Sequence, residues 1–217
     1  MVLPLYLAMS ASEFRPIPRP AFLVLEDRQV PPAGVLPVIT DAFAPDRQTL
    51  LRLCRGREAV LLDFERPPTA EVREMIRDLP CPAGAPPGYA HEGPVFLPPA
   101  PLHVPMEEYL SPWKGREIWL EAALQKQILT VTAEGCAVFP PCTNTNFEGG
   151  FYSEKLQCRF RQNFSENQAI FTLFDTPDTL RMKLDHAAEL GVTRAIGLFQ
   201  ELGEKDRKST RLNSSHL

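Results

Sequence analysis

The stretch Ala59-Val60-Leu61-Leu62-Asp63-Phe64-Glu65 decides the fold that this sequence predicts. It opens with four uninterrupted apolar residues, which is typical of a parallel strand buried on both faces. It ends on two acids that are two residues apart, so on a strand both side chains lie on the same face. In parallel α/β barrels, side chains at the carboxyl ends of the strands line the site. The stretch therefore predicts a barrel strand that brings Asp63 and Glu65 to the carboxyl-terminal rim.

Seven other apolar runs, most of them also continuous rather than alternating, predict the remaining strands of a small (β/α)8, TIM-type barrel. We expect this barrel to be a single domain over residues 1–204. The eight predicted strands are Leu3–Met9, Ala21–Glu26, Val35–Thr40, Ala59–Phe64, Val95–Leu97, Glu117–Ala122, Ala169–Phe174 and Arg194–Phe199.

Helical patterns follow several of these strands, as a parallel sheet requires. Two of them cover residues 46–55 and 69–78. The strongest runs from Thr176 to about Leu190, with Thr176 as its N-cap, Pro177 in the first helical position and Gly191 as its stop. The strand–helix–strand succession at this spacing predicts a βαβ crossover into the last strand, which favours a parallel sheet.

Two segments interrupt this rhythm. Residues 10–20 join the first two strands and are too rich in proline to form a helix. Between Gln127 and Asn167, two strand-like runs flank a loop rich in Cys, Thr, Asn and Gly. We interpret this segment as a β-hairpin-like insertion near the rim rather than as part of the barrel.

The bulk composition favours a compact globular protein and excludes several classes. Of the 217 residues, 44% are hydrophobic and the net charge is −4, without a long basic run, so we expect no nucleic-acid partner. No apolar run reaches the ~18 residues of a membrane span, and no signal-peptide pattern opens the chain. The five cysteines form no C-x-x-C pair, so we expect no metal site, no cofactor and, by default, a cytoplasmic location.

The last thirteen residues, 205–217, differ in character from the rest of the chain. The stretch Lys208–Leu217 has no apolar periodicity and resembles translated sequencing adapter. Residues 205–217 are therefore expected to be an artefactual or disordered tail without a role in the site.

Several further residues at strand ends are candidates for the site. Glu121 could serve as the second carboxylate of a pair with Glu65, or face a basic neighbour near a helix start. Trp119 and Tyr6 could stack on sugar rings or pack in the core. Asp41 and Asp175 could line the mouth, although helix capping is the expected role of each. We assign Glu121, Trp119, Tyr6, Asp175 and Gln200 to substrate binding.

Asp63-Phe64-Glu65 resembles the end of the D-x-x-D-x-D-x-E signature of glycoside hydrolase family 18, which lies at the end of barrel strand four. The segment from Phe174 to Gly197 is similar to the family's seventh strand, seventh helix and eighth strand. The resemblance implies a barrel in which Glu65 is the proton donor and Asp63 orients the substrate amide. In that mechanism the substrate's own carbonyl is the nucleophile.

The sequence departs from the family pattern at four positions. Glu58 and Leu61 occupy the first two acidic positions of the signature, and Gln200 stands where a tryptophan floors the sugar pocket. The family's strand-six tyrosine has no counterpart in residues 117–121. These departures argue against a chitin-like substrate.

Three functions are compatible with these observations. The leading hypothesis is a divergent glycoside hydrolase that uses Glu65 as general acid on a carbohydrate. The second is a non-catalytic carbohydrate-binding or scaffold barrel that keeps a vestigial acidic pair. The third is a barrel enzyme of unrelated chemistry, because fold does not fix function.

Overall fold

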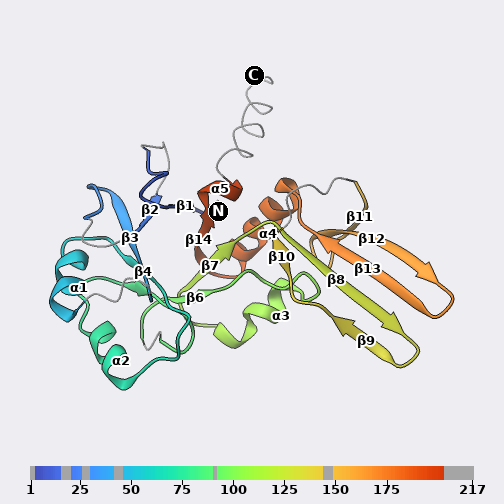
Figure 1. Cartoon of the computed structure of the whole chain (residues 1–217), viewed down its shortest axis with the longest axis horizontal. Coiled ribbons are helices and arrows are strands. Elements are labelled where there is room, and N and C mark those ends of the chain that lie inside the picture. The colour runs from blue at the N-terminus through green and yellow to red at the C-terminus, as the bar shows by residue number, and fades with distance from the viewer. Residues whose placement is uncertain are drawn as a thin grey trace.

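The computed structural model describes residues 3–15, 21–25, 30–41, 46–89, 92–143 and 149–202. Its main body is a parallel eight-stranded sheet that curls into a nearly closed α/β barrel, as predicted (Figure 1). In order around the barrel, the strands are β5 (Ala83–Gly84), β4 (Val60–Asp63), β3 (Val35–Thr40), β2 (Ala21–Val24), β1 (Leu5–Met9), β14 (Val192–Leu198), β7 (Ile118–Ala122) and β6 (Val95–Leu97).

The two ends of this sheet meet at a short seam. A single parallel bridge pairs Ala85, just after β5, with Val95 of β6. The Phe96 N–H donates to the Ala85 carbonyl over 2.7 Å, and the Ala85 N–H donates to Pro94 over 3.2 Å. These bonds join β5 to β6 and bring the barrel close to closure.

The three helices predicted over residues 46–55, 69–78 and 176–190 are present and pack outside the barrel. Asp46 caps α1 through the Thr49 N–H, Thr69 caps α2 through the Val72 N–H, and Thr176 caps α4 through the Thr179 N–H. Pro177 opens α4, as expected for the first helical position. The helices are α1 (Arg47–Cys54), α2 (Ala70–Arg77), α3 (Met106–Leu110), the 3-10 turn η1 (Ser111–Trp113), α4 (Pro177–Glu189) and α5 (Phe199–Leu202).

The barrel has two apolar layers, which explains the continuous apolar runs. Side chains that point inward fill the barrel, and those that point outward pack beneath the helices. The inward layer consists of Tyr6, Ala8, Phe22, Leu36, Val38, Ala59, Leu61, Phe96, Trp119 and Ile196.

The predicted β-hairpin-like insertion between β7 and α4 is present as a larger antiparallel sheet. It projects to one side of the barrel (Figure 1). The strand order is β10–β8–β13–β12–β11, with β9 paired to the outer part of β8. The strands are β8 (Gln125–Thr132), β9 (Gly135–Val138), β10 (Cys142–Thr143), β11 (Phe151–Ser153), β12 (Cys158–Ser165) and β13 (Gln168–Phe174).

This sheet corrects one strand assignment. The run 169–174 was predicted as the seventh barrel strand, but it lies in β13 and pairs antiparallel with β8 and β12. The missing barrel strand is β5, which has only two residues. As a result, residues 118–122 form the seventh strand rather than the sixth. Residues 203–217, which include the expected tail, lie outside the described residues.

Candidate active site

Two carboxylates point into the barrel at its carboxyl-terminal mouth. On β4, Leu61 belongs to the inward layer, and Asp63 follows it by two residues on the same face. On β7, Trp119 belongs to that layer, and Glu121 likewise follows two residues later. Parallel strands end at the same rim, so both acids lie above the apolar filling of the barrel.

Glu121 is the acid that its surroundings perturb most clearly. Burial raises the pKa of Glu121 to about 7, and the negative charges of Asp63 and Glu201 act in the same direction. Burial and the charge of Glu121 in turn raise the pKa of Tyr109 on α3 to about 12. The Tyr109 hydroxyl donates to the Pro98 carbonyl over 2.8 Å. Near neutral pH, Glu121 therefore retains a proton in a substantial fraction of molecules.

Asp63 is open to solvent at the rim but is still perturbed. The pKa of Asp63 is raised, mainly because the protein atoms packed around it exclude water. The negative charges of Glu65 and Asp41 add to this shift. The three acids thus repel one another along the ends of β3 and β4. Like charges gathered in this way favour retention of a proton by one member of the group.

The loop after β4 is fixed by Asp41 at the end of β3. Its Oδ2 accepts the Glu65 N–H over 2.6 Å and the Arg66 N–H over 2.9 Å. The Tyr89 hydroxyl donates to the Arg66 carbonyl, and the Tyr89 ring packs against Phe64 at 5.2 Å. Asp41 therefore anchors the loop that carries Glu65, whereas the predicted helix cap is supplied by Asp46.

A third side of the mouth is formed by α5, directly after β14. The Gln200 side chain donates to Glu13, which lowers the pKa of that carboxyl. The neighbouring Glu201 accepts from the Thr143 hydroxyl at 3.4 Å through Oε1. Its Oε2 is buried without a hydrogen-bond partner among the described residues. A third carboxylate is thereby held close enough to Glu121 to raise its pKa.

Trp119 and Tyr6 lie below the mouth, within the barrel filling. Trp119 has no exposed surface, and its indole N–H donates to Glu117 Oε1 over 2.9 Å. The Arg194 guanidinium lies 4.7 Å from the Trp119 ring centroid and 5.2 Å from that of Tyr6. In this structure both rings therefore pack in the core, the second of the two roles considered from the sequence.

Asp175 lies behind the mouth, where the antiparallel sheet joins α4. Its carboxylate accepts from Lys183 Nζ over 2.7 Å, and both side chains are almost fully buried. Burial raises the pKa of Asp175, while the Lys183 charge opposes that shift. A small hollow is lined by Asp175, Lys183, Gln125 and Glu121. The N-cap of α4 is Thr176, as predicted for that residue, and not Asp175.

The structure thus brings together Asp63, Glu65, Glu121 and Glu201 around one rim and leaves Trp119 and Tyr6 beneath it. At the end of the last strand the sequence offered Gln200 or Glu201, and Gln200 was assigned to the site, whereas the acid near Glu121 is Glu201. Among the described residues, no group of three or more His, Cys, Asp or Glu side chains has the geometry of a metal site. Within the same ranges, no helix is long and apolar enough to cross a membrane.

No protein-family model matches this chain, and no curated protein matches its sequence. Among solved structures, it is similar to the Bacillus cereus spore cortex-lytic enzyme SleL, with 12% sequence identity and a TM-score of 0.46. The similarity covers 90% of this chain and 70% of that one. The function of this chain has to be inferred from the side chains at its barrel mouth.

Proposed function

We propose that this protein hydrolyses a glycosidic bond at the carboxyl-terminal mouth of its barrel. The observation that carries this proposal is the pair of inward-pointing acids, Asp63 and Glu121, on strands β4 and β7. Glycoside hydrolysis commonly requires one protonated and one ionised carboxyl group on either side of the scissile bond. Acids whose environments separate their protonation states meet that requirement.

In this mechanism, Glu121 is the general acid. Its pKa of about 7 keeps a proton available at neutral pH for transfer to the leaving oxygen of the sugar. The resemblance to family 18 would assign this role to Glu65, but the Glu65 side chain is exposed on the loop that Asp41 anchors. Glu121 is partly buried beside Asp63 and Glu201, and this environment favours its protonated form. That supports Glu121 as the general acid in place of Glu65.

Asp63 and Glu65 supply the partner carboxylate. Once ionised, one of them either activates a water molecule or attacks the anomeric carbon, and the product's anomeric configuration distinguishes the two routes. Asp41 assists by holding the loop in place, because its carboxylate accepts hydrogen bonds from the Glu65 and Arg66 N–H groups. The substrate class under this proposal is a carbohydrate.

The test is a panel of fluorogenic glycosides assayed with wild type and with Glu121→Gln, Glu65→Gln and Asp63→Asn. Glu121→Gln is expected to lower kcat/KM at least ~100-fold, because an amide cannot donate the proton. In the wild type, the rate should fall as the pH rises through about 7, where Glu121 loses its proton. A matched control is Glu108→Gln, the same chemical change at an exposed position on α3.

Each outcome distinguishes between the hypotheses. Full activity in Glu121→Gln together with loss in Glu65→Gln would transfer the acid role to Glu65. If no glycoside is cleaved but a polysaccharide still binds, the chain is a carbohydrate-binding barrel instead of a hydrolase.

A further inference from the structure

The antiparallel sheet has one face without charge. Cross-strand pairing places three rows of side chains on this face. The rows are Phe151–Phe160–Leu173–Gln127, Gln162–Phe171–Leu129–Val138 and Phe164–Ala169–Val131–Cys136. We call these twelve residues the apolar face. The opposite face carries Lys126, Arg159 and Arg161, so the sheet is amphipathic.

Only the end of the apolar face nearest the barrel is covered by the described chain. There Leu102 packs with Leu173 and Cys158, and Leu129 and Phe160 border that cluster. Farther out, Phe164 is 64% exposed and Val138 43%, and Phe151 on the edge strand β11 is 62% exposed. Ring contacts tie these exposed side chains to the same face, because Phe151 lies 5.6 Å from Phe160 and Phe164 lies 6.3 Å from Phe171.

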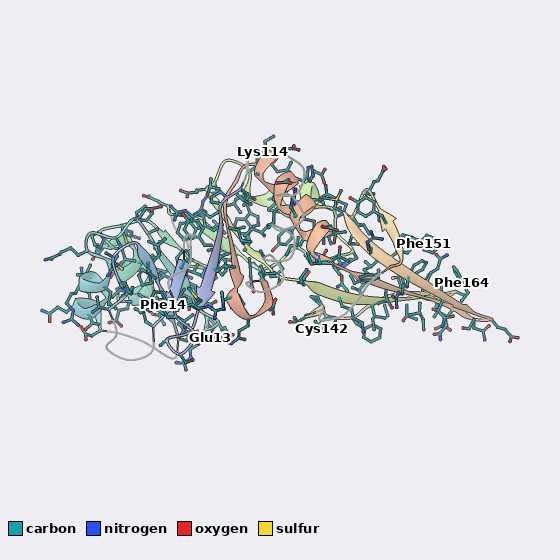
Figure 2. All side chains as sticks on the ribbon, turned by 90° about the horizontal axis from the view of Figure 1, so that it is seen from above. Glu13, Phe14, Lys114, Cys142, Phe151 and Phe164 are labelled. Carbon is teal, nitrogen blue, oxygen red and sulfur yellow. The ribbon has the colours of Figure 1, made fainter. Side chains whose placement is uncertain are left out.

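The exposed part of the apolar face is as large as surface patches that often have a function. The outer Phe and Val side chains leave on the order of 400 Å² of apolar surface open, which matches the largest patch on a typical monomer. Figure 2 shows Phe151 and Phe164 on the arm that projects away from the barrel. A flat surface on such an arm can meet another molecule without contact between the barrels.

We propose that the apolar face binds the same face of a second copy of this chain, forming a two-fold β-sandwich. The absence of charge among these twelve residues supports this proposal. When two copies of the apolar face are brought together, no like charges repel each other. Sheets pack face to face in this manner about 10 Å apart, with their inner side chains interdigitated. The contact is isologous, meaning that both chains use the same patch. Each outer phenylalanine is therefore buried in both copies of the chain.

The chemistry of the face argues against two other occupants. A sugar chain would require hydrogen-bonding groups interleaved with the rings, yet the polar side chains in the three rows are two glutamines and one cysteine. One of these, Gln127, already bonds His103 and the Phe139 carbonyl. A membrane surface would favour basic residues beside the apolar ones, but those residues lie on the opposite face.

The small size of the apolar face predicts a weak dimer. Two copies would bury roughly 800 Å² through these outer side chains, at the low end of protein interfaces, so we expect a dissociation constant in the micromolar range. The dimer should therefore form progressively as the protein is concentrated.

The experiment is analytical ultracentrifugation of the full chain from about 1 to about 500 µM. The wild type is expected to shift from 24.3 kDa toward twice that mass. Phe164→Lys and, separately, Phe151→Lys should weaken the dimer at least 10-fold, since each places a charge in the apolar face. Asn163→Lys is the matched control: it introduces the same charge one residue away, on the opposite face.

Circular dichroism of each variant establishes that it is folded before its mass is interpreted. A wild type that stays monomeric throughout overturns the proposal, as does a dimer that survives both phenylalanine substitutions. If the wild type is monomeric and Phe164→Lys abolishes binding to an insoluble polysaccharide, the occupant is a carbohydrate and the second-copy assignment fails.

Discussion

Glu121 connects the chemistry of the barrel mouth to the stability of the fold. Its pKa is raised from 4.5 to about 7 in the folded protein, so between these values the folded state binds more protons than the unfolded state. Stability from this residue is therefore fully present below pH 4.5 and is lost as the pH rises toward 7. The same burial that keeps an acid ready to donate its proton also weakens the fold in alkaline solution.

Glu121→Gln is consequently expected to be more stable than the wild type at pH 8 and equally stable at pH 4. Because water reaches part of this side chain, the gain at pH 8 is on the order of 1 kcal/mol. Urea unfolding of both proteins across this pH range measures the difference. A stability difference that is constant from pH 4 to pH 8 would show that Glu121 does not titrate in this window.

Gly84 illustrates a packing constraint at a single atom. A Cβ on Gly84 would lie 2.0 Å from Trp119 Cε3, so the indole ring occupies the space that any other residue would need. We expect Gly84→Ala to lower stability by about 1–3 kcal/mol, because an overpacked core has to shift backbone or ring.

A double-mutant cycle with Trp119→Leu identifies the cause of that loss in thermal unfolding. If the clash is responsible, Gly84→Ala should cost much less in the Trp119→Leu background. Gly88→Ala is the matched control, since its added Cβ would lie no closer than 3.3 Å to Pro68. An equal cost of Gly84→Ala in both backgrounds would rule out the clash as its cause.

Among the elements, α4 depends on a buried ion pair at its start. Lys183 reaches back to Asp175 at the end of β13, and this contact joins the antiparallel sheet to the helix that leads into β14. Removing the ammonium leaves a carboxylate in an apolar environment, which is far more costly than removing both partners.

Lys183→Met should therefore destabilise the protein by about 3–5 kcal/mol, and adding Asp175→Asn should restore most of that loss. Chemical denaturation of the two variants measures both effects. Lys114→Met, at an exposed position between η1 and β7, is the control and should change stability by less than ~0.5 kcal/mol. If the double variant is as unstable as the single one, the pair stabilises the junction through its own attraction rather than by neutralising Asp175.

The elements also show where sequence reasoning succeeds and where it fails. The apolar runs at β1, β3, β4 and β14 were recognised because strands buried on both faces read as continuous apolar sequence. The two-residue β5 carries no such pattern, since Ala83 and Gly84 are small and prolines stand nearby. The run 169–174 was misplaced because it is as apolar as a barrel strand, with its last two residues buried and the four before them half-buried.

The candidate site was predictable to a similar degree. Asp63 and Glu121 were assigned to the site because each stands at the end of an apolar strand. The sequence did not reveal that Glu121 is the more perturbed acid, since burial and the nearness of Glu201 depend on the folded barrel. The anchoring of Glu65 by Asp41 also depends on contacts between β3 and β4.

At the scale of the whole molecule, the chain combines a parallel barrel with a projecting antiparallel sheet, and the two bury their surfaces differently. The barrel buries both faces of its sheet, so its outer surface is helix and loop. The projecting sheet buries side chains at its barrel end, Leu173 on one face and Phe174 on the other, and its exposed outer part offers contact with another molecule. Under the proposals made above, catalysis belongs to the rim of the first body and self-association to the arm formed by the second.

The seam between β5 and β6 gives the barrel an internal reporter. Every other pair of adjacent barrel strands is joined by a run of two or more paired residues, whereas one bridge at Ala85 and Val95 joins these two. Trp119 lies beside that seam with its ring against Gly84, entirely shielded from water. If β5 and β6 separate before the other strands do, water reaches the Trp119 indole before the rest of the barrel unfolds. The wavelength of the fluorescence emission maximum of Trp119 would then report the separation of β5 from β6.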